Sequence, residues 1–199
     1  MTDTRDKFLD VATRHFAERG FYGVSIAQVS TELGLSKQAL LHHFGNKEKL
    51  YAEVLKRLSD DLMQQITVSD EGTSGISQVQ AVFISIYRNA KNNLDATQLL
   101  VRELLDNKQR AKAAHHWYLV PFLETLTNIV SNSAKNTPLS KTQALAVVYQ
   151  FIASIHYFLI SGTTLQSMFG NEQYQALDNT YEQELLATIA SRLDALEAT

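Results

Sequence analysis

The residues with the clearest chemical potential lie on one face of a short segment, residues 37–44. If this segment is helical, that face carries Lys37, Gln38, Leu41 and His42. Basic, amide and apolar side chains together can contact base edges and thymine methyl groups in the major groove of DNA. A solvated helix face does not usually include a leucine. The mixture therefore indicates a surface for a nucleic-acid partner.

Two lysines extend this region at the start of the next predicted helix. Lys47 and Lys49 lie in its first turn, where the helix dipole disfavours a cation by about 0.3–1 kcal/mol each. Backbone N–H groups at a helix start bind anions, and a phosphate there would offset the unfavourable placement. The alternative is that Glu48 screens two solvated lysines. The spacing alone leaves both interpretations open.

The elements that would position these residues form a helix-turn-helix pattern. Apolar residues at helical spacing predict a first helix over residues 4–19. Ser25 and Gln28 have the spacing of a capping box and predict a short helix that ends at Gly34. Ser36 is the candidate N-cap of the helix that follows. The side chains expected in the core of this unit include Phe8, Leu9, Ala12, Phe16, Leu40 and Phe44.

The rest of the chain is also predicted to be helical, because no segment of useful length alternates with period two. The composition of residues 68–75 predicts a linker. Pro121 is expected to kink a long helix. The helices predicted after the helix-turn-helix are 47–66, 76–92, 96–107, 111–135, 140–169 and 172–196.

The composition narrows the possible classes of function. The chain has 199 residues, 45% of them hydrophobic, and no cysteine, which excludes disulfide frameworks and thiol catalysis. The net charge is −3, with 7 Lys/Arg against 6 Asp/Glu in residues 1–50 and 11 against 15 in the remainder. A weakly basic N-terminal part on an acidic body hints at an anionic partner at the N-terminus.

Residues 5–50 resemble the DNA-binding domain of the TetR family of bacterial transcriptional regulators. The resemblance rests on residue types at matching spacings. The matching positions are Phe8, Leu9, Ala12, Phe16, Gly20 and Phe21, then Ser25 and Ile26, then Gly34, Leu35 and Ser36, and finally the run from Leu40 to Leu50.

The resemblance implies an all-α fold of about nine helices. A three-helix DNA-binding domain (residues 1–49) would precede a helical ligand-binding and dimerisation domain (residues 50–199). Lys37 and Gln38 would read bases, while Lys47 and the histidines would hold the DNA backbone. The residues implied to contact DNA are Ser25, Gln28, Ser36, Lys37, Gln38, Ala39, Leu41, His42, His43 and Lys47.

Two positions depart from the family pattern. Leu41 stands where the family most often has Tyr, so a phosphate-bonding hydroxyl is replaced by an apolar contact. Ala27 stands where some members carry Arg, so a base contact is missing. Both departures bear on which operator is read.

The C-terminal body offers candidates for an effector pocket. Aromatic side chains in its middle helices would favour an apolar or aromatic small molecule, although such stripes are usually core. Arg102 could pair with a ligand carboxylate, with an internal salt bridge or a solvated face as the alternative. The candidate pocket residues are Phe83, Tyr87, Arg102, Trp117, Tyr118, Phe122 and His156.

The same body offers candidates for a homodimer interface. Apolar residues cover more than one face of the segment 144–159, which exceeds what a monomer surface helix requires. With the last helix it could form a four-helix bundle between subunits, or both could pack only within one subunit. The candidate interface residues are Val148, Phe151, Ile155, Leu159, Tyr181, Leu185 and Ile189.

Metal binding and catalysis find little support in the sequence. Adjacent histidines, as in the pairs 42–43 and 115–116, diverge by about 100° on a helix and cannot chelate one ion as an i,i+4 pair would. No Gly-rich phosphate loop or cysteine nucleophile is present, so no cofactor and no enzymatic activity are expected. The apolar run 144–161 is interrupted by Gln150 and His156, and we interpret it as a core or interface helix.

The sequence thus predicts a cytoplasmic, homodimeric DNA-binding regulator without membrane partners. By the resemblance, it would be a repressor that binds a near-palindromic duplex and is released by a small molecule. The alternative is a helical small-molecule sensor or carrier without DNA-binding activity.

Overall fold

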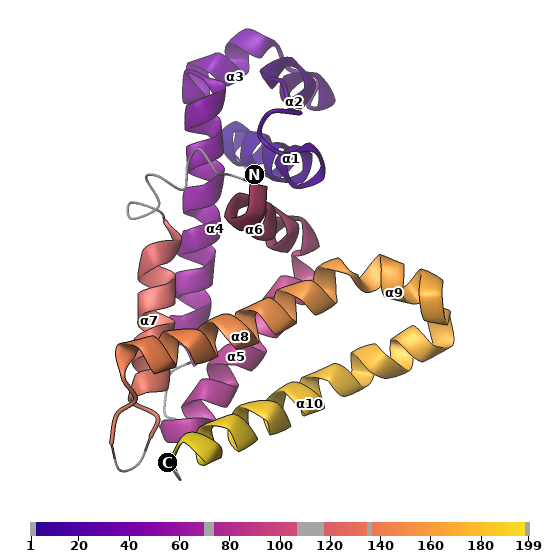
Figure 1. Cartoon of the computed structure of the whole chain (residues 1–199). Helices are drawn as coiled ribbons and strands as arrows, with labels where there is room; N and C mark the ends of the chain where they lie inside the picture. The colour runs from indigo at the N-terminus through magenta and orange to yellow at the C-terminus, as the bar shows by residue number, and fades with distance from the viewer. Residues whose placement is uncertain (1–2, 70–73, 107–117, 135–136, 198–199) are drawn as a thin grey trace. The chain divides into compact units, whose positions relative to one another are not determined.

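The computed structural model describes residues 3–69, 74–106, 118–134 and 137–197 (Figure 1). Within these residues it contains ten α-helices and no strand, so the predicted all-α fold is confirmed. The chain divides into two compact units. The first comprises Met1–Asp60 and Asn93–Tyr118, and the second comprises Asp61–Asn92 and Leu119–Thr199. The predicted domain boundary after residue 49 stays a prediction.

The first unit contains four helices and the start of a fifth. They are α1 (Thr4–Arg19), α2 (Ile26–Glu32), α3 (Lys37–Phe44), α6 (Leu94–Asp106) and the first part of α4 (Lys47–Ser69). The helix α1 packs against α2 and α6, and α2 packs against α3. Phe8, Phe16 and Leu40 are fully buried between these helices, as their spacing predicts, and Leu50 is fully buried as well.

The turn between α2 and α3 is tight. The backbone N–H of Leu35 donates to the carbonyl oxygen of Ser30 at 2.9 Å, which folds the chain back at the end of α2. Gly34 adopts φ of +66°, a conformation that other residues reach only with strain. This glycine therefore sets the direction in which α3 leaves the turn, and the helix-turn-helix pattern predicted from the sequence is present.

The second unit is built around the contact between two apolar helices, α7 (Leu119–Ser131) and α8 (Lys141–Ile160). The helix α5 (Gly75–Asn92) packs against both, and α10 (Asn171–Glu197) packs against α5 and the short α9 (Gly162–Phe169). By length and composition α8 could cross a membrane, with a mean hydropathy of 1.5, but half of that window is buried inside the structure. Burial of this kind is typical of a core helix in a globular protein.

Two predictions about these helices are wrong. Residues 140–169 form two helices, because the Ser161 hydroxyl donates to the Phe158 carbonyl oxygen and Gly162 follows. A Cβ atom on Gly162 would lie 2.5 Å from the Tyr174 hydroxyl, so glycine permits α10 to approach this break. Pro121 lies in the first turn of α7, where its missing N–H removes no intrahelical bond, and it does not kink a helix interior. Residues 111–117 of the predicted long helix lie outside the described residues.

Candidate nucleic-acid interface

The start of α2 is fixed by the predicted capping box. The Ser25 hydroxyl oxygen accepts from the Gln28 backbone N–H at 3.2 Å, and the Ser25 N–H donates to Gln28 Oε1 at 2.8 Å. Both side chains are exposed. The Ser25 O–H and the Gln28 side-chain NH2 remain donors that point to solvent at this helix start. This arrangement leaves two neutral donors suited to phosphate oxygens.

The helix α3 presents the mixed face predicted from the sequence. Ser36 caps it by accepting from the Ala39 N–H at 3.2 Å. Lys37, Gln38 and His42 are exposed. Leu41 and Ala39 are half-buried on the same helix. The outward face therefore offers one cation, one amide and one imidazole above a small apolar strip.

The opposite face of α3 holds the helix in place. Leu40 is fully buried, and the Phe44 ring meets the Phe8 ring of α1 edge to face, with 6.2 Å between centroids. The His43 ring also lies over this corner, 5.8 Å from the Phe8 centroid, while its side chain stays exposed. The Arg5 guanidinium covers the Phe44 ring at 5.4 Å and pairs with Glu53 at 2.8 Å. These contacts fix the direction in which the polar face of α3 points.

A shallow groove of about 430 Å³ lies where α3 ends and α4 begins. His42, His43 and Lys49 line it together with Glu53. Lys49 is exposed, and its backbone N–H donates to the Asn46 side chain at 2.8 Å. The groove thus joins three groups that can contact an anion, with one carboxylate at its edge.

Lys47 is placed differently from its neighbour Lys49. Its ammonium donates to the carbonyl oxygen of Val24 at 2.8 Å and lies 4.4 Å from the centroid of the Phe21 ring. The side chain is half-buried. Of the lysines in the first turn of α4, Lys49 faces solvent and Lys47 turns toward the loop that precedes α2.

A buried histidine supports the end of α2, and no pattern other than helical spacing could have predicted it from the sequence. His15 Nε2 lies 2.7 Å from Glu32 Oε2, and Arg14 binds the other oxygen of the same carboxylate. Burial lowers the pKa of His15, and the positive charges of Arg19 and Arg14 lower it further against the opposing effect of Glu18. The neutral ring then donates to Glu32, which ties α1 to the last residue of α2.

The predicted pocket residues are distributed between the two units. Phe83, Tyr87, Phe122 and His156 are buried in the second unit. Burial lowers the pKa of His156 to about 4. Arg102 and Tyr118 belong to the first unit, where Arg102 donates to the Glu18 carbonyl oxygen at 3.1 Å. Trp117 lies outside the described residues.

Several of these aromatic rings pack against predicted interface residues. The Phe83 ring meets the Phe151 ring with 5.2 Å between centroids, and Tyr87 lies 5.3 Å from Tyr181. Tyr181 also stacks on Phe158 at 3.9 Å. The predicted pocket residues Phe83 and Tyr87 therefore share one core in the second unit with predicted interface residues.

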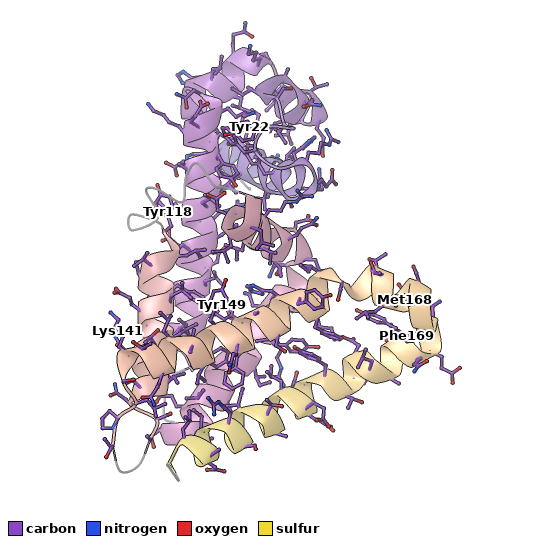
Figure 2. All side chains as sticks on the ribbon, viewed as in Figure 1. Tyr22, Tyr118, Lys141, Tyr149, Met168 and Phe169 are labelled. Carbon is purple, nitrogen blue, oxygen red and sulfur yellow. The ribbon has the colours of Figure 1, made fainter. Side chains whose placement is uncertain are left out.

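The predicted interface residues are mostly buried within the single chain. This holds for Val148, Phe151, Ile155, Leu159, Leu185 and Ile189, while Tyr181 is half-buried. The outward face of α8 carries a different apolar set (Figure 2 shows Tyr149 among them). Its exposed apolar side chains are Leu145, Tyr149, Tyr157 and Ile160, with Met168 and Phe169 exposed on α9. Along α8 these side chains are four, eight and three residues apart, and this helical spacing was the signal that could have found them.

A small groove of about 240 Å³ lies between α8 and α10. Phe151, Tyr181 and Leu185 contribute to it, together with polar side chains such as Ser154 and Arg192. Ser154 and Tyr181 share a hydrogen bond of 2.8 Å between their hydroxyls. None of the predicted pocket residues that the structure describes lines this groove.

No cluster of three or more potential metal ligands occurs among the residues that the structure describes. The rings of His42 and His43 are inclined at 72° to each other, with 5.9 Å between their centroids. His115 and His116 fall in a segment outside the described residues.

The helix-turn-helix unit also matches a known protein family in sequence. Residues 8–54 match the family of bacterial regulatory proteins named the tetR family. The regulator LmrA of Bacillus subtilis (strain 168) is 38% identical over 65 residues, which cover 32% of this chain and 35% of LmrA. The repressor AcnR of Corynebacterium efficiens is 36% identical over 70 residues, covering 35% of this chain and 36% of AcnR.

The fold likeness extends over nearly the whole chain. The structure of the ketosteroid transcriptional regulator KstR2 of Mycobacterium tuberculosis matches with a TM-score of 0.66 at 16% identity, covering 94% of this chain and 95% of that one. The aligned segments span about a third of the length of the two curated relatives above. The match of residues 8–54 to the tetR family confirms the predicted resemblance of the N-terminal part to that family.

Proposed function

We propose that this protein is a DNA-binding transcriptional regulator of the TetR type that acts as a repressor. The observation that carries the proposal is the placement of α3. Buried Leu40 and Phe44 fix the helix, while Lys37, Gln38 and His42 face outward. A helix held in this way fits the major groove, and the donors of Ser25 and Gln28 at the start of α2 would contact neighbouring phosphates.

The residue roles follow from chemistry and exposure. Gln38 is the amide that reads a base edge, and Lys37 contacts a base or the adjacent phosphate. His42, His43 and Lys49 line the groove beside α3 and contact the backbone. Half-buried Leu41 and Ala39 provide apolar contact with a thymine methyl group, as expected where a tyrosine hydroxyl is missing. Ser36 donates its hydroxyl hydrogen to phosphate while it caps α3.

The regulator acts as a homodimer that places two α3 helices in successive major grooves, so its operator is a near-palindrome. The outward face of α8 supports this assembly, because it exposes Leu145, Tyr149 and Tyr157 along one stripe. A symmetric pairing of this face with its copy would cover the stripe. The buried residues predicted for the interface would then pack beneath this stripe and hold α8 in place.

Release from DNA requires a ligand that binds the non-DNA state more tightly. The aromatic core of the second unit, with Phe83, Phe122 and His156, is the proposed region for an apolar or aromatic effector. The protein would work in the cytoplasm, where its operator and a diffusible effector meet.

Selection of bound duplexes from a random pool tests the proposal. The expected result is a near-palindromic consensus with two half-sites, bound more weakly as salt rises. Repeating the binding assay with a library of apolar and aromatic metabolites identifies the effector. A protein that enriches no sequence and binds no duplex at low ionic strength would instead be a sensor or carrier without DNA-binding activity.

A further inference from the structure

The lysine at the first position of α4 has an unusual environment for a surface cation. Lys47 Nζ donates to the Val24 carbonyl oxygen at 2.8 Å and stands 4.4 Å above the Phe21 ring. Val24 is buried, with 3% of its surface exposed. The carbonyl and the ring face compensate a cation placed where the helix dipole disfavours one.

The loop that Lys47 holds is itself closely packed. The Phe21 ring stacks on Phe16 at 6.2 Å and meets Tyr51 edge to face at 5.1 Å. A Cβ atom on Gly23 would lie 2.4 Å from the Arg19 carbonyl oxygen, so the chain passes there without room for a side chain. The loop therefore has a defined conformation, and it leads directly into the capping box of α2 at Ser25.

We propose that Lys47 is a positioning residue, which fixes the start of α2 through Val24 so that the donors of Ser25 and Gln28 reach the DNA backbone. This role rests on the proposed function. The charge that contacts phosphate at this end of α4 is supplied by Lys49, which is exposed and lines the groove beside α3. A lysine that stays bound to a carbonyl oxygen neutralises no phosphate, so it displaces no counterion from the DNA. A lysine that contacts a phosphate does displace one.

The two lysines form a matched pair for a test. Lys47→Met and Lys49→Met remove the same charge from the same helical turn, so any nonspecific effect of net charge is common to both. Binding to the selected operator is measured against salt concentration at 10 °C below the lowest melting temperature of the set. K49M is expected to reduce the slope of log K against log salt by about 1. K47M is expected to weaken binding about tenfold with a slope within about 0.3 of wild type.

Thermal unfolding provides a second measurement of the role of Lys47, and it needs no DNA. K47M is expected to lower Tm by about 3–6 °C, because a charge-assisted hydrogen bond is lost, and K49M by less than about 1 °C. Lys47→Arg keeps a donor that can reach Val24 and should restore both Tm and affinity. A wild-type protein that binds no duplex would refute the proposed function. The unfolding measurement would still decide whether Lys47 holds the loop.

A double-mutant cycle separates positioning from a merely structural role. Ser25→Ala removes the hydroxyl that Lys47 is proposed to position, so K47M should weaken binding much less in that background than in the wild type. Equal weakening in both backgrounds would overturn the proposal, and so would a K47M slope reduced by about 1 with Tm unchanged.

Discussion

The hydroxyl of Tyr51 donates to Glu103 Oε2 over 2.5 Å, and both side chains are almost fully buried in the first unit. Tyr51 belongs to α4, and its ring also meets Phe16 and Phe21, which support the loop before α2. Glu103 belongs to α6. One hydrogen bond therefore joins α6 to the aromatic cluster behind the helix-turn-helix.

Tyr51→Phe tests the contribution of this bond to stability. The substitution keeps the ring and removes the donor, which leaves a buried carboxylate with one partner fewer. We expect the free energy of unfolding to fall by about 2 kcal/mol, measured by urea denaturation at pH 7. The exposed Tyr22→Phe is the control and should change stability by less than about 0.5 kcal/mol. An unchanged midpoint for Tyr51→Phe would show that the bond does not contribute.

His156 makes stability depend on pH. Burial lowers its folded-state pKa to about 4, from an ordinary value of 6.5. Between these values the unfolded chain binds a proton that the folded chain does not, so stability is complete above about pH 6.5 and falls as the pH drops toward 4. The loss from this one group is about 3 kcal/mol.

The measurement compares wild type with His156→Leu by chemical denaturation from pH 7.5 to 4. The difference in the free energy of unfolding between the two proteins isolates the histidine from other titrating groups. This difference should shift in favour of the leucine variant by about 3 kcal/mol as the pH falls. Parallel curves would mean that His156 takes up a proton equally well in both states.

Gln38 is expected to determine one position of the operator. Gln38→Ala removes an exposed amide from α3 without touching buried Leu40. Discrimination at one base pair in each half-site should relax by about 1–3 kcal/mol, as read from a repeated DNA selection. Lys49→Ala serves for comparison, because the loss of a phosphate contact would weaken all sequences alike. A consensus identical to wild type would rule out base reading by Gln38.

The outward stripe of α8 is expected to hold the dimer together. Tyr157 is 73% exposed in the single chain, and a carboxylate there would be buried without a partner in a symmetric interface. Tyr157→Glu should therefore shift the protein to monomers in sedimentation velocity and weaken operator binding. Tyr22→Glu places the same change on a residue that is 77% exposed in the first unit and should leave the dimer intact. A dimeric Tyr157→Glu variant would move the interface elsewhere.

The parts of this protein that the sequence determined are those set by local bonds. The Ser25 and Ser36 caps and the turn at Gly34 depend on groups three to five residues apart, and all three are present as predicted. Helical spacing likewise identified Leu40 and Phe44 as the buried side of α3. These features could be predicted without knowing how the helices pack against one another.

Tertiary structure determined the contacts and the burial that residue spacing does not predict. The helix α8 carries apolar side chains on more than one face, and their spacing does not show which face meets the core of the same chain. Packing against α5 and α7 buried Phe151 and left Tyr157 outside. The contacts of Lys47 with Val24 and of His15 with Glu32 join residues 23 and 17 positions apart. Charge and residue type say that such a group needs a partner, and only the folded chain determines whether a carbonyl, a carboxylate or bound DNA provides it.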